Sequence, residues 1–182
     1  MPRYVALFRG INVGKAKRIA MADLRKLLEK LGYTEVKTLL NSGNAIFTGG
    51  VGASSGHAQR IRAAVAKRLG VDAVVVVKSA RDVAGIMAGN ELHKLASDPS
   101  RLLVAVTDTP AALAGLKAAA TRAWGAERVH LGKHAAYVWC ADGILESQAL
   151  TAVMKGLAGA GTTRNWATLG KIHDLLRETD GS

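Results

Sequence analysis

The chain has 182 residues with a mean hydropathy of +0.13 and 49% hydrophobic residues, so it can bury a core and is not a disordered chain. No stretch reaches the roughly 18 uninterrupted apolar residues of a membrane-spanning helix, and the first residues lack the tripartite layout of a signal peptide. A single cysteine excludes an internal disulfide and suits a reducing compartment. We therefore expect a cytoplasmic protein without a membrane partner.

The positive charge is concentrated in the first half of the chain. The sequence has 25 Lys and Arg against 14 Asp and Glu, a net charge of +11. Residues 1–90 hold 15 of the basic and 5 of the acidic residues, whereas residues 91–182 hold 10 and 9. A basic surface attracts polyanions such as nucleic acid. The alternative is that these solvated side chains only keep the protein soluble.

The first half reads as a βαββαβ pattern, which is typical of a ferredoxin-like fold. An apolar stripe from Met21 to Leu31 indicates one helix and a second stripe from Ala58 to Leu69 indicates another. Apolar runs separated by turn residues predict the strands, at residues 4–8, 36–40, 45–47 and 73–77.

The second half repeats this order without a clear final strand. A capping box at Ser79 and Asp82 predicts a connecting helix through Ala88, and Thr109-Pro110 opens a helix to about Arg122. The other predicted elements are a strand at 102–107, a hairpin of 128–131 with 134–140, and helices at 149–157 and 166–176. The fold class is therefore α+β, with two packed ferredoxin-like halves, the second incomplete and ending in a C-terminal helix.

We expect the halves, residues 1–90 and 91–182, to form one compact unit. The strands at 4–8, 73–77 and 102–106 are apolar at every position. Strands of this kind are covered on both faces, whereas strands with one wet face alternate polar and apolar residues.

The segment from Arg9 to Arg18 follows a strand and precedes a helix, as a phosphate-binding loop does. Three residues separate Gly10 from Gly14, and Ala16 follows Lys15, so the spacing and the magnesium-binding hydroxyl of a nucleoside triphosphatase loop are both missing. Backbone N–H groups beside several cations can still hold a phosphate or carboxylate. The alternative is a tight connection in which glycine supplies a positive φ.

Two further polar motifs stand out. Asn41-Ser42-Gly43-Asn44 predicts a hairpin turn. In Thr162-Thr163-Arg164-Asn165-Trp166, either Thr163 or Asn165 can cap the last helix, which leaves Arg164 at the positive end of the helix dipole. A cation there is easier to understand if it faces an anion, either a carboxylate of the protein or a ligand.

Neither a metal site nor catalytic machinery is evident. With a two-residue turn at Gly132-Lys133, His130 and His134 point to opposite faces of the hairpin and cannot share an ion, so we expect no metal and no cofactor. Cys140 lies in an apolar strand and reads as a buried hydrophobe. Tyr4, Phe8 and Phe47 could contact RNA on a ferredoxin-like sheet, but they read more readily as core.

The motifs Arg9–Gly14, Asn41–Asn44 and Thr162–Trp166 together resemble the bacterial domain-of-unknown-function family 1697. The resemblance extends from Tyr4 to about Leu176, with Lys15 where many members have a second glycine. It implies a compact two-part α+β protein of the bacterial cytosol and carries no activity, cofactor or catalytic residue.

The favoured hypothesis is a non-catalytic module that binds a phosphate-rich partner, nucleic acid above all, through the basic first half. The residues expected to bind are Arg9, Asn12, Lys15, Lys17 and Arg18, with Arg25, Lys26 and Lys30 beside them and Arg164 and Asn165 from the last motif. If the motifs form one site, Arg9, Asn12 and Arg164 should line one concave surface. The alternative is a small-molecule or nucleotide-binding enzyme with its site between the halves. The oligomeric state is left open.

Overall fold

The computed structural model describes residues 1–178. The chain divides into two compact units, of which unit 1 comprises Met1–Val83 and Ile172–Ser182 and unit 2 comprises Ala84–Lys171. The boundaries fall inside the helices α3 (Ala80–Ala88) and α7 (Trp166–Arg177), which therefore contribute to both units. The units are close to the expected ranges 1–90 and 91–182, except that the end of α7 belongs with unit 1. The packing of the two halves into one body stays a prediction.

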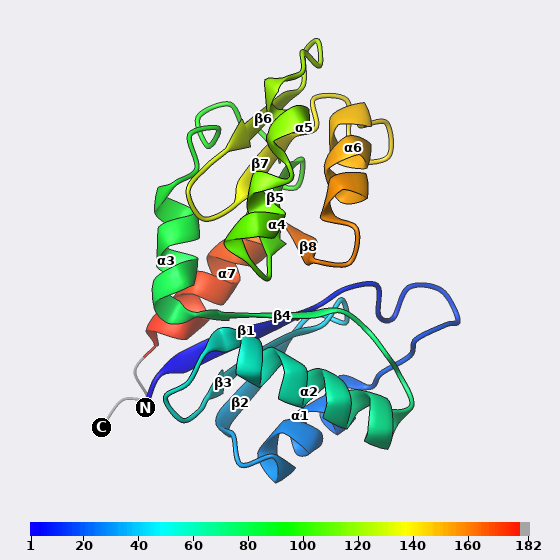
Figure 1. Ribbon diagram of the computed structural model, residues 1–182, viewed down its shortest axis with the longest axis vertical. Coiled ribbons are helices and arrows are strands. Elements are labelled where there is room, and N and C mark those ends of the chain that lie inside the picture. Colours follow the sequence, from blue (N-terminus) through cyan, green and yellow to red (C-terminus); the bar gives the residue numbers. More distant parts are fainter. Residues whose placement is uncertain (179–182) are drawn as a thin grey trace. The chain divides into compact units, whose positions relative to one another are not determined.

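Unit 1 is a four-stranded antiparallel sheet with two helices on one face (Figure 1). Its elements are β1 (Arg3–Phe8), α1 (Met21–Lys30), β2 (Thr34–Leu39), β3 (Asn44–Thr48), α2 (Ser54–Leu69) and β4 (Val75–Ser79). The strand order is β2-β3-β1-β4, so the central strands are the first and third of the βαββαβ series. The ferredoxin-like prediction is confirmed for this half.

The predicted helical stripes form the core of unit 1. Leu24 and Leu28 of α1 and Ile61 and Val65 of α2 are buried against alternate residues of the sheet, because positions three and four apart lie on one face of a helix. Gly70 ends α2 in a left-handed conformation. The aromatic residues of the strands are buried as well, so their interpretation as core is confirmed; they are Tyr4, Phe8 and Phe47.

Unit 2 has the same topology with one element that the sequence did not reveal. Its elements are β5 (Leu102–Thr107), α4 (Pro110–Ala114), α5 (Lys117–Thr121), β6 (Arg128–Leu131), β7 (Ala136–Trp139), α6 (Gln148–Leu157) and β8 (Gly161–Asn165). The order β6-β7-β5-β8 repeats that of unit 1. The expectation of an incomplete second half was therefore wrong, because β8 supplies the fourth strand, antiparallel to β5.

The missed strand lacks the pattern by which strands are recognised. Thr162, Thr163, Arg164 and Asn165 are all polar, so neither an apolar run nor an alternation marks them. Their conformation follows from backbone pairing, in which Thr163 lies opposite Ala105 and Gly161 opposite Thr107. Pairing of this kind satisfies main-chain groups whatever the side chains are.

Two local predictions in unit 2 need correction. The helix expected from Pro110 to Arg122 is interrupted at Gly115 and Leu116, which separate α4 from α5. The hairpin turn is longer than expected, since Gly132 N donates to Ala135 O (2.9 Å) and the strands pair His130 with Tyr137. The predicted two-residue turn at Gly132-Lys133 was therefore wrong.

The predicted starts of the helices α3 and α4 are both confirmed. Ser79 N donates to Asp82 Oδ2 (2.9 Å) and Asp82 N to Ser79 Oγ (3.1 Å), which is the reciprocal capping box. Ala112 N donates to Thr109 Oγ1 (3.1 Å) ahead of α4. These contacts depend on residues three positions apart, so the sequence alone was sufficient to find them.

The central strands are buried on both faces, as their apolar runs predicted. Tyr4 and Ala6 of β1 face α1 and α2, while Val5 and Leu7 point to the opposite side and are equally buried. All residues of β5 are buried too. Neither strand therefore offers a wet face to a ligand.

Candidate functional site

The loop after β1 is held in shape by the side chain of Asn12. Its Nδ2 group donates to Ile19 O and to Asn41 O, both at 2.8 Å, and its Oδ1 accepts from Ile19 N at 2.7 Å. Asn12 itself has a φ of 56°, a left-handed conformation that Asn tolerates better than most residues. Because both amide hydrogens are used inside the protein, Asn12 acts as a brace of this loop.

The hairpin turn packs directly on this loop, so two of the three polar motifs form one assembly. Gly43 has a φ of 92°, and a Cβ at this position would lie 2.5 Å from Ile11 Cδ1. Its carbonyl oxygen accepts from Phe8 N at 3.0 Å. Glycine is required here for both reasons, the positive φ and the close approach. The contact with Asn41 completes the assembly, which we call the loop–turn cluster (residues 9–20 and 40–44).

The cations of the loop–turn cluster differ in their availability. Arg18 Nη1 donates back to Asn12 O (3.3 Å) and Gly14 O (3.2 Å), which ties its guanidinium to the loop. Arg9 is half-buried, and its backbone N–H donates to Val74 O (2.9 Å). Lys15 and Lys17 are exposed. The side chains most available to a partner are therefore the two lysines.

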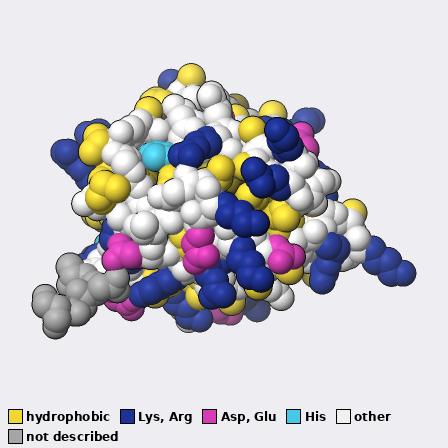
Figure 2. Space-filling view, turned by 90° about the horizontal axis from the view of Figure 1, so that it is seen from below, with side chains coloured by type: hydrophobic (Ala, Val, Ile, Leu, Met, Phe, Trp, Pro, Cys, Tyr) yellow, Lys and Arg dark blue, Asp and Glu magenta, His cyan; other side chains and the backbone are white. Residues whose placement is uncertain are grey.

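A second group of cations lies on the helices α1 and α2. Lys26 and Lys30 of α1 and Arg68 of α2 line one surface hollow of about 350 Å³, together with Asp23. Within residues 1–178, none of these three cations has a hydrogen-bond or ion-pair partner. Figure 2 shows this side of unit 1, with Lys and Arg side chains spread over it and fewer acidic ones between them.

Arg68 was not among the predicted residues, although a signal for it existed. The expected basic surface included Arg25, Lys26 and Lys30, which share α1 and are all exposed. Arg68 lies in the last turn of α2, 38 positions after Lys30, so only the packing of α1 against α2 brings it to the same hollow. The sequence feature that could have pointed to Arg68 is the composition of α2, which carries several cations and no acidic residue in its first turn.

The third motif lies in unit 2 and is part of the sheet. Arg164 is in β8, opposite Val104, and only 7% of it is exposed. Its Nη1 group donates to Thr162 Oγ1 (2.9 Å) and Thr163 O (2.8 Å), and burial lowers the pKa of its guanidinium to about 10. Arg164 was expected at the N-terminal end of the last helix. It is instead a residue of strand β8, two positions before α7 begins.

The neighbouring Asn165 caps the last helix, a role that the sequence allowed for either Thr163 or Asn165. Its Oδ1 accepts from Thr168 N at 2.8 Å, which caps the first turn of α7. Since Asn12 belongs to unit 1 and Arg164 to unit 2, a single concave surface made by Arg9, Asn12 and Arg164 stays a prediction.

The histidines, the acidic residues and the cysteine are the remaining candidates for reactive groups. Among residues 1–178, no three His, Cys, Asp or Glu side chains gather closely enough to hold a metal ion. Cys140 is fully buried, and burial raises the pKa of its thiol. A thiol is nucleophilic as the thiolate, so this cysteine is a poor nucleophile.

The chain belongs to the family described as "Protein of unknown function (DUF1697)", which matches residues 1–137. The family inferred from the motifs is thereby confirmed, over a range that includes Arg9–Gly14 and Asn41–Asn44 but not Thr162–Trp166. A solved structure, that of the conserved bacterial protein SP0830 from Streptococcus pneumoniae, is similar with a TM-score of 0.77 and 23% sequence identity. The match covers 97% of this chain and 99% of that one, and at this identity it shows the fold alone.

Two further findings bear on the assignment. No curated protein shows significant similarity to this chain. No helix formed by residues 1–178 has the length and apolar character needed to cross a lipid bilayer.

Proposed function

We propose that the protein is a non-catalytic module that binds a phosphate-rich partner, nucleic acid above all, through the basic surface of unit 1. The observation that carries the proposal is the convergence of Lys26, Lys30 and Arg68 on one hollow without a partner inside residues 1–178. Lys15 and Lys17 of the loop–turn cluster extend the supply of exposed cations.

Unpaired cations that share a hollow repel one another. Lys26 and Lys30 are four residues apart in α1, a spacing at which like charges destabilise a helix. A polyanion removes this repulsion and releases its own counterions when it binds. The arrangement therefore costs the free protein a little stability and favours the bound state.

The mode of recognition follows from where the aromatic residues lie. Tyr4, Phe8, Tyr33 and Phe47 are each less than 5% exposed, so the sheet of unit 1 has no aromatic platform on which bases can stack. Contacts of lysine and arginine with phosphates position a nucleic acid without reading its sequence. We expect binding that is independent of sequence and stronger for a duplex, because a duplex has the higher density of phosphates.

The test is fluorescence anisotropy with labelled duplex and single-stranded oligonucleotides of two unrelated sequences over a series of salt concentrations. The logarithm of the affinity should fall linearly with the logarithm of the salt concentration, with a slope of about −0.7 to −0.9 per phosphate contacted. The triple variant K26E/K30E/R68E should weaken binding to all sequences alike. It should also reduce the magnitude of the slope by up to the contribution of about three phosphate contacts.

A charge-matched control separates this surface from net charge. K94E/K117E/K155E reverses three exposed lysines of unit 2 and changes the net charge by the same amount. We expect this control to retain most of the affinity. An affinity that does not depend on salt, or two triple variants with equal affinity, would remove the proposed surface.

A further inference from the structure

The loop–turn cluster exposes two large aliphatic side chains, one on its loop and one on its turn. Val13 is 73% exposed and Leu40 is 50% exposed. Val13 follows Asn12 and Leu40 precedes Asn41, and Asn12 Nδ2 donates to Asn41 O at 2.8 Å. The two aliphatic groups therefore flank one contact on the surface of unit 1, although they are far apart in the sequence.

The backbone of Leu40 is strained. Its φ of 61° is in the left-handed region, which brings the Cβ of a side chain too close to the following carbonyl oxygen. The position is not held by glycine or asparagine, which adopt this conformation more easily. Burial does not repay the strain, since half of Leu40 is exposed. Strain that the fold does not repay points to a use for the side chain itself.

The surroundings hold Leu40 in a fixed position. Gly43 N donates to Leu40 O at 3.3 Å, and Asn44 Nδ2 donates to Leu39 O at 2.8 Å. On the loop side, the Arg18 guanidinium donates to backbone oxygens of its own loop. A surface with a shape fixed in advance favours a partner that has a defined shape of its own, whereas a fluid lipid surface gains nothing from it.

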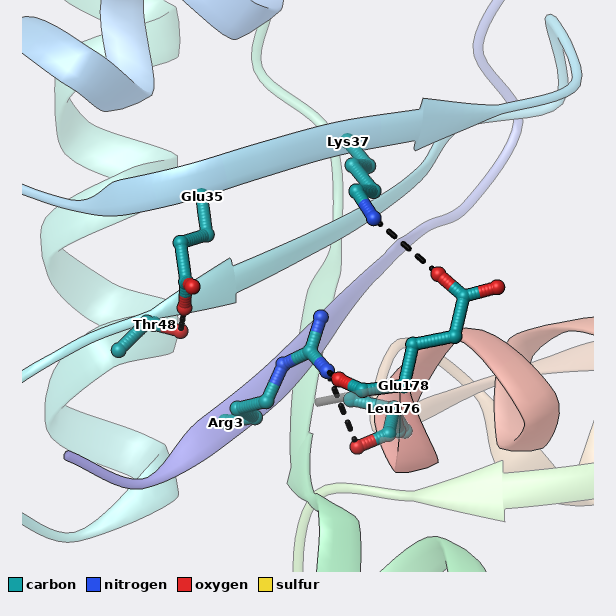
Figure 3. A network of polar contacts seen from close by, with 6 residues as sticks. All are labelled: Arg3, Glu35, Lys37, Thr48, Leu176 and Glu178. Atoms are coloured by element: carbon teal, nitrogen blue, oxygen red, sulfur yellow. Dashed lines mark hydrogen bonds and ion pairs between the residues drawn. The ribbon is translucent and has the colours of Figure 1, made fainter. Parts of the chain in front are cut away.

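The cluster is basic, and part of its charge is not paired within the protein. Residues 9–20 contain four Lys or Arg residues, and neither they nor residues 40–44 contain an Asp or Glu. Other cations of unit 1 are held internally, as Figure 3 shows for Lys37, whose Nζ lies 3.1 Å from Glu178 Oε2. Within residues 1–178, the side chain of Lys15 has no hydrogen-bond or ion-pair partner.

The acidic side chains of neighbouring elements leave the surface positive. Arg62 donates to both carboxylate oxygens of Asp72, at 2.7 and 3.1 Å, and the pKa of Asp72 is lowered by Arg62 and to a smaller extent by Lys17. Asp23 of α1 lies among the cations of the hollow on α1 and α2. The surface therefore attracts a negatively charged partner. A second copy of this chain would bring the same four cations to the contact, which disfavours self-association through this face.

We infer that the loop–turn cluster is a docking surface for an acidic peptide segment of a partner protein, in which Asp or Glu residues stand beside aliphatic ones. Aliphatic side chains of the segment pack on Val13 and Leu40, while its carboxylates meet Lys15 and Lys17. The phosphates of a nucleic acid would leave the two aliphatic groups without an apolar counterpart. The inference does not depend on the proposed binding of polyanions, which is carried by the hollow on α1 and α2.

The test measures the affinity of a short labelled peptide of repeated Leu-Glu-Glu units by fluorescence anisotropy. A control peptide of the same length has Ser-Glu-Glu units and therefore the same charge without the aliphatic groups. The wild type should bind the Leu-Glu-Glu peptide and bind the control about tenfold more weakly, because the control buries no apolar surface.

The variant L40N separates binding from folding. Asparagine adopts a left-handed conformation more easily than leucine, so L40N should resist urea at least as well as the wild type while its affinity for the Leu-Glu-Glu peptide falls about tenfold. The matched control is L145N, since Leu145 of unit 2 is 97% exposed and has no positive φ, and it should change neither property. V13S and K15E/K17E should weaken peptide binding as well.

Three results would overturn the inference. They are the absence of binding to the Leu-Glu-Glu peptide, equal affinities for the two peptides, and an L40N variant that binds as tightly as the wild type. Vesicles that contain phosphatidylserine and a labelled DNA duplex are measured in parallel, and a dependence on Leu40 seen only with one of these would replace the peptide by that partner. A loss of oligonucleotide binding in K26E/K30E/R68E with the Leu40 dependence of peptide binding intact would concern only the proposed function.

Discussion

Units 1 and 2 have the same strand order but place their polar residues differently. In unit 1 the two sheet-covering helices are continuous, of 10 and 16 residues, and their outer surface carries unpaired cations. In unit 2 the counterpart of α1 is broken into α4 and α5 of five residues each. Topology is therefore set by apolar stripes and backbone pairing, while the capacity to bind a partner depends on surface residues that the topology leaves free.

The polar side chains that join distant segments also differ between the two units. In unit 1, Asn12 joins two loops that are distant in sequence. In unit 2, the hydroxyl of Tyr137 donates to Ile86 O at 2.5 Å and ties a strand to the end of α3. Substitutions in each unit should therefore have different consequences, which provides a way to test the comparison.

The largest effect is expected at the hairpin turn of unit 1. G43A should lower the free energy of unfolding by about 3 kcal/mol, because a methyl group would clash with Ile11 and the positive φ would be strained. The measurement is urea unfolding followed by circular dichroism. G32A is the control, since Gly32 has a similar φ of 90° with nothing within 4 Å, and it should cost only about 1 kcal/mol.

The corresponding turn of unit 2 sharpens this comparison. Gly132 does not have a positive φ, and a Cβ at this position would lie 3.0 Å from Tyr137 Cε2. G132A should therefore cost less than G43A. Equal losses in G43A and G32A would show that the contact between loop and turn adds nothing to stability.

Substitution of Asn12 in the loop–turn cluster should give the next largest effect. N12A removes three hydrogen bonds and leaves Ile19 O and Asn41 O without their donor, so it should cost about 2 kcal/mol. N41A should stay within about 0.5 kcal/mol of the wild type, because Asn41 contributes its backbone oxygen to this contact. A large loss of stability in N41A would mean that the side chain of Asn41, and not the amide of Asn12, holds the turn.

Tyr137 should make the stability of unit 2 depend on pH in the alkaline range. Burial raises the pKa of this tyrosine to about 12, above its ordinary value of 10, so the folded state favours the neutral hydroxyl. Its contribution is complete below pH 10 and is lost as the pH rises from 10 to about 12.

The variant Y137F isolates this contribution. It should cost about 1 kcal/mol near neutral pH, through the lost hydrogen bond to Ile86 O. The difference in unfolding free energy between wild type and Y137F should shrink above pH 10, because only the wild type has this group to protonate on folding. A difference that stays constant with pH would contradict the role of burial at this hydroxyl.

The smallest effect is expected for the cations of the helical hollow. K26A and K30A should change the free energy of unfolding by less than about 0.5 kcal/mol, and relief of their mutual repulsion can make either variant slightly more stable. S147A in unit 2 is the comparison, since Ser147 Oγ accepts from Leu150 N at 2.9 Å and caps α6, and its loss should cost about 1 kcal/mol. A clear loss of stability in K26A would show that these cations have an internal structural role.

The sequence by itself determined the features that depend on residues close together in the chain. The stripe of Leu24, Leu27 and Leu28 marked α1, the box of Ser79 and Asp82 marked the start of α3, and the βαββαβ order of the first half indicated the fold class. These signals arise from helix and strand periodicity and from capping, which act over two to four residues. The family inferred from the sequence is the one whose model matches residues 1–137.

Only the tertiary structure decided how distant segments meet. Strand β8 exists because β5 offers it a free edge, the hairpin register places His130 opposite Tyr137, and Asn12 meets Asn41 across 29 positions. The hollow of Lys26, Lys30 and Arg68 likewise depends on the packing of α1 against α2. The physical reason is that backbone pairing and helix packing depend on the whole set of partners available in the folded chain, which local patterns do not record.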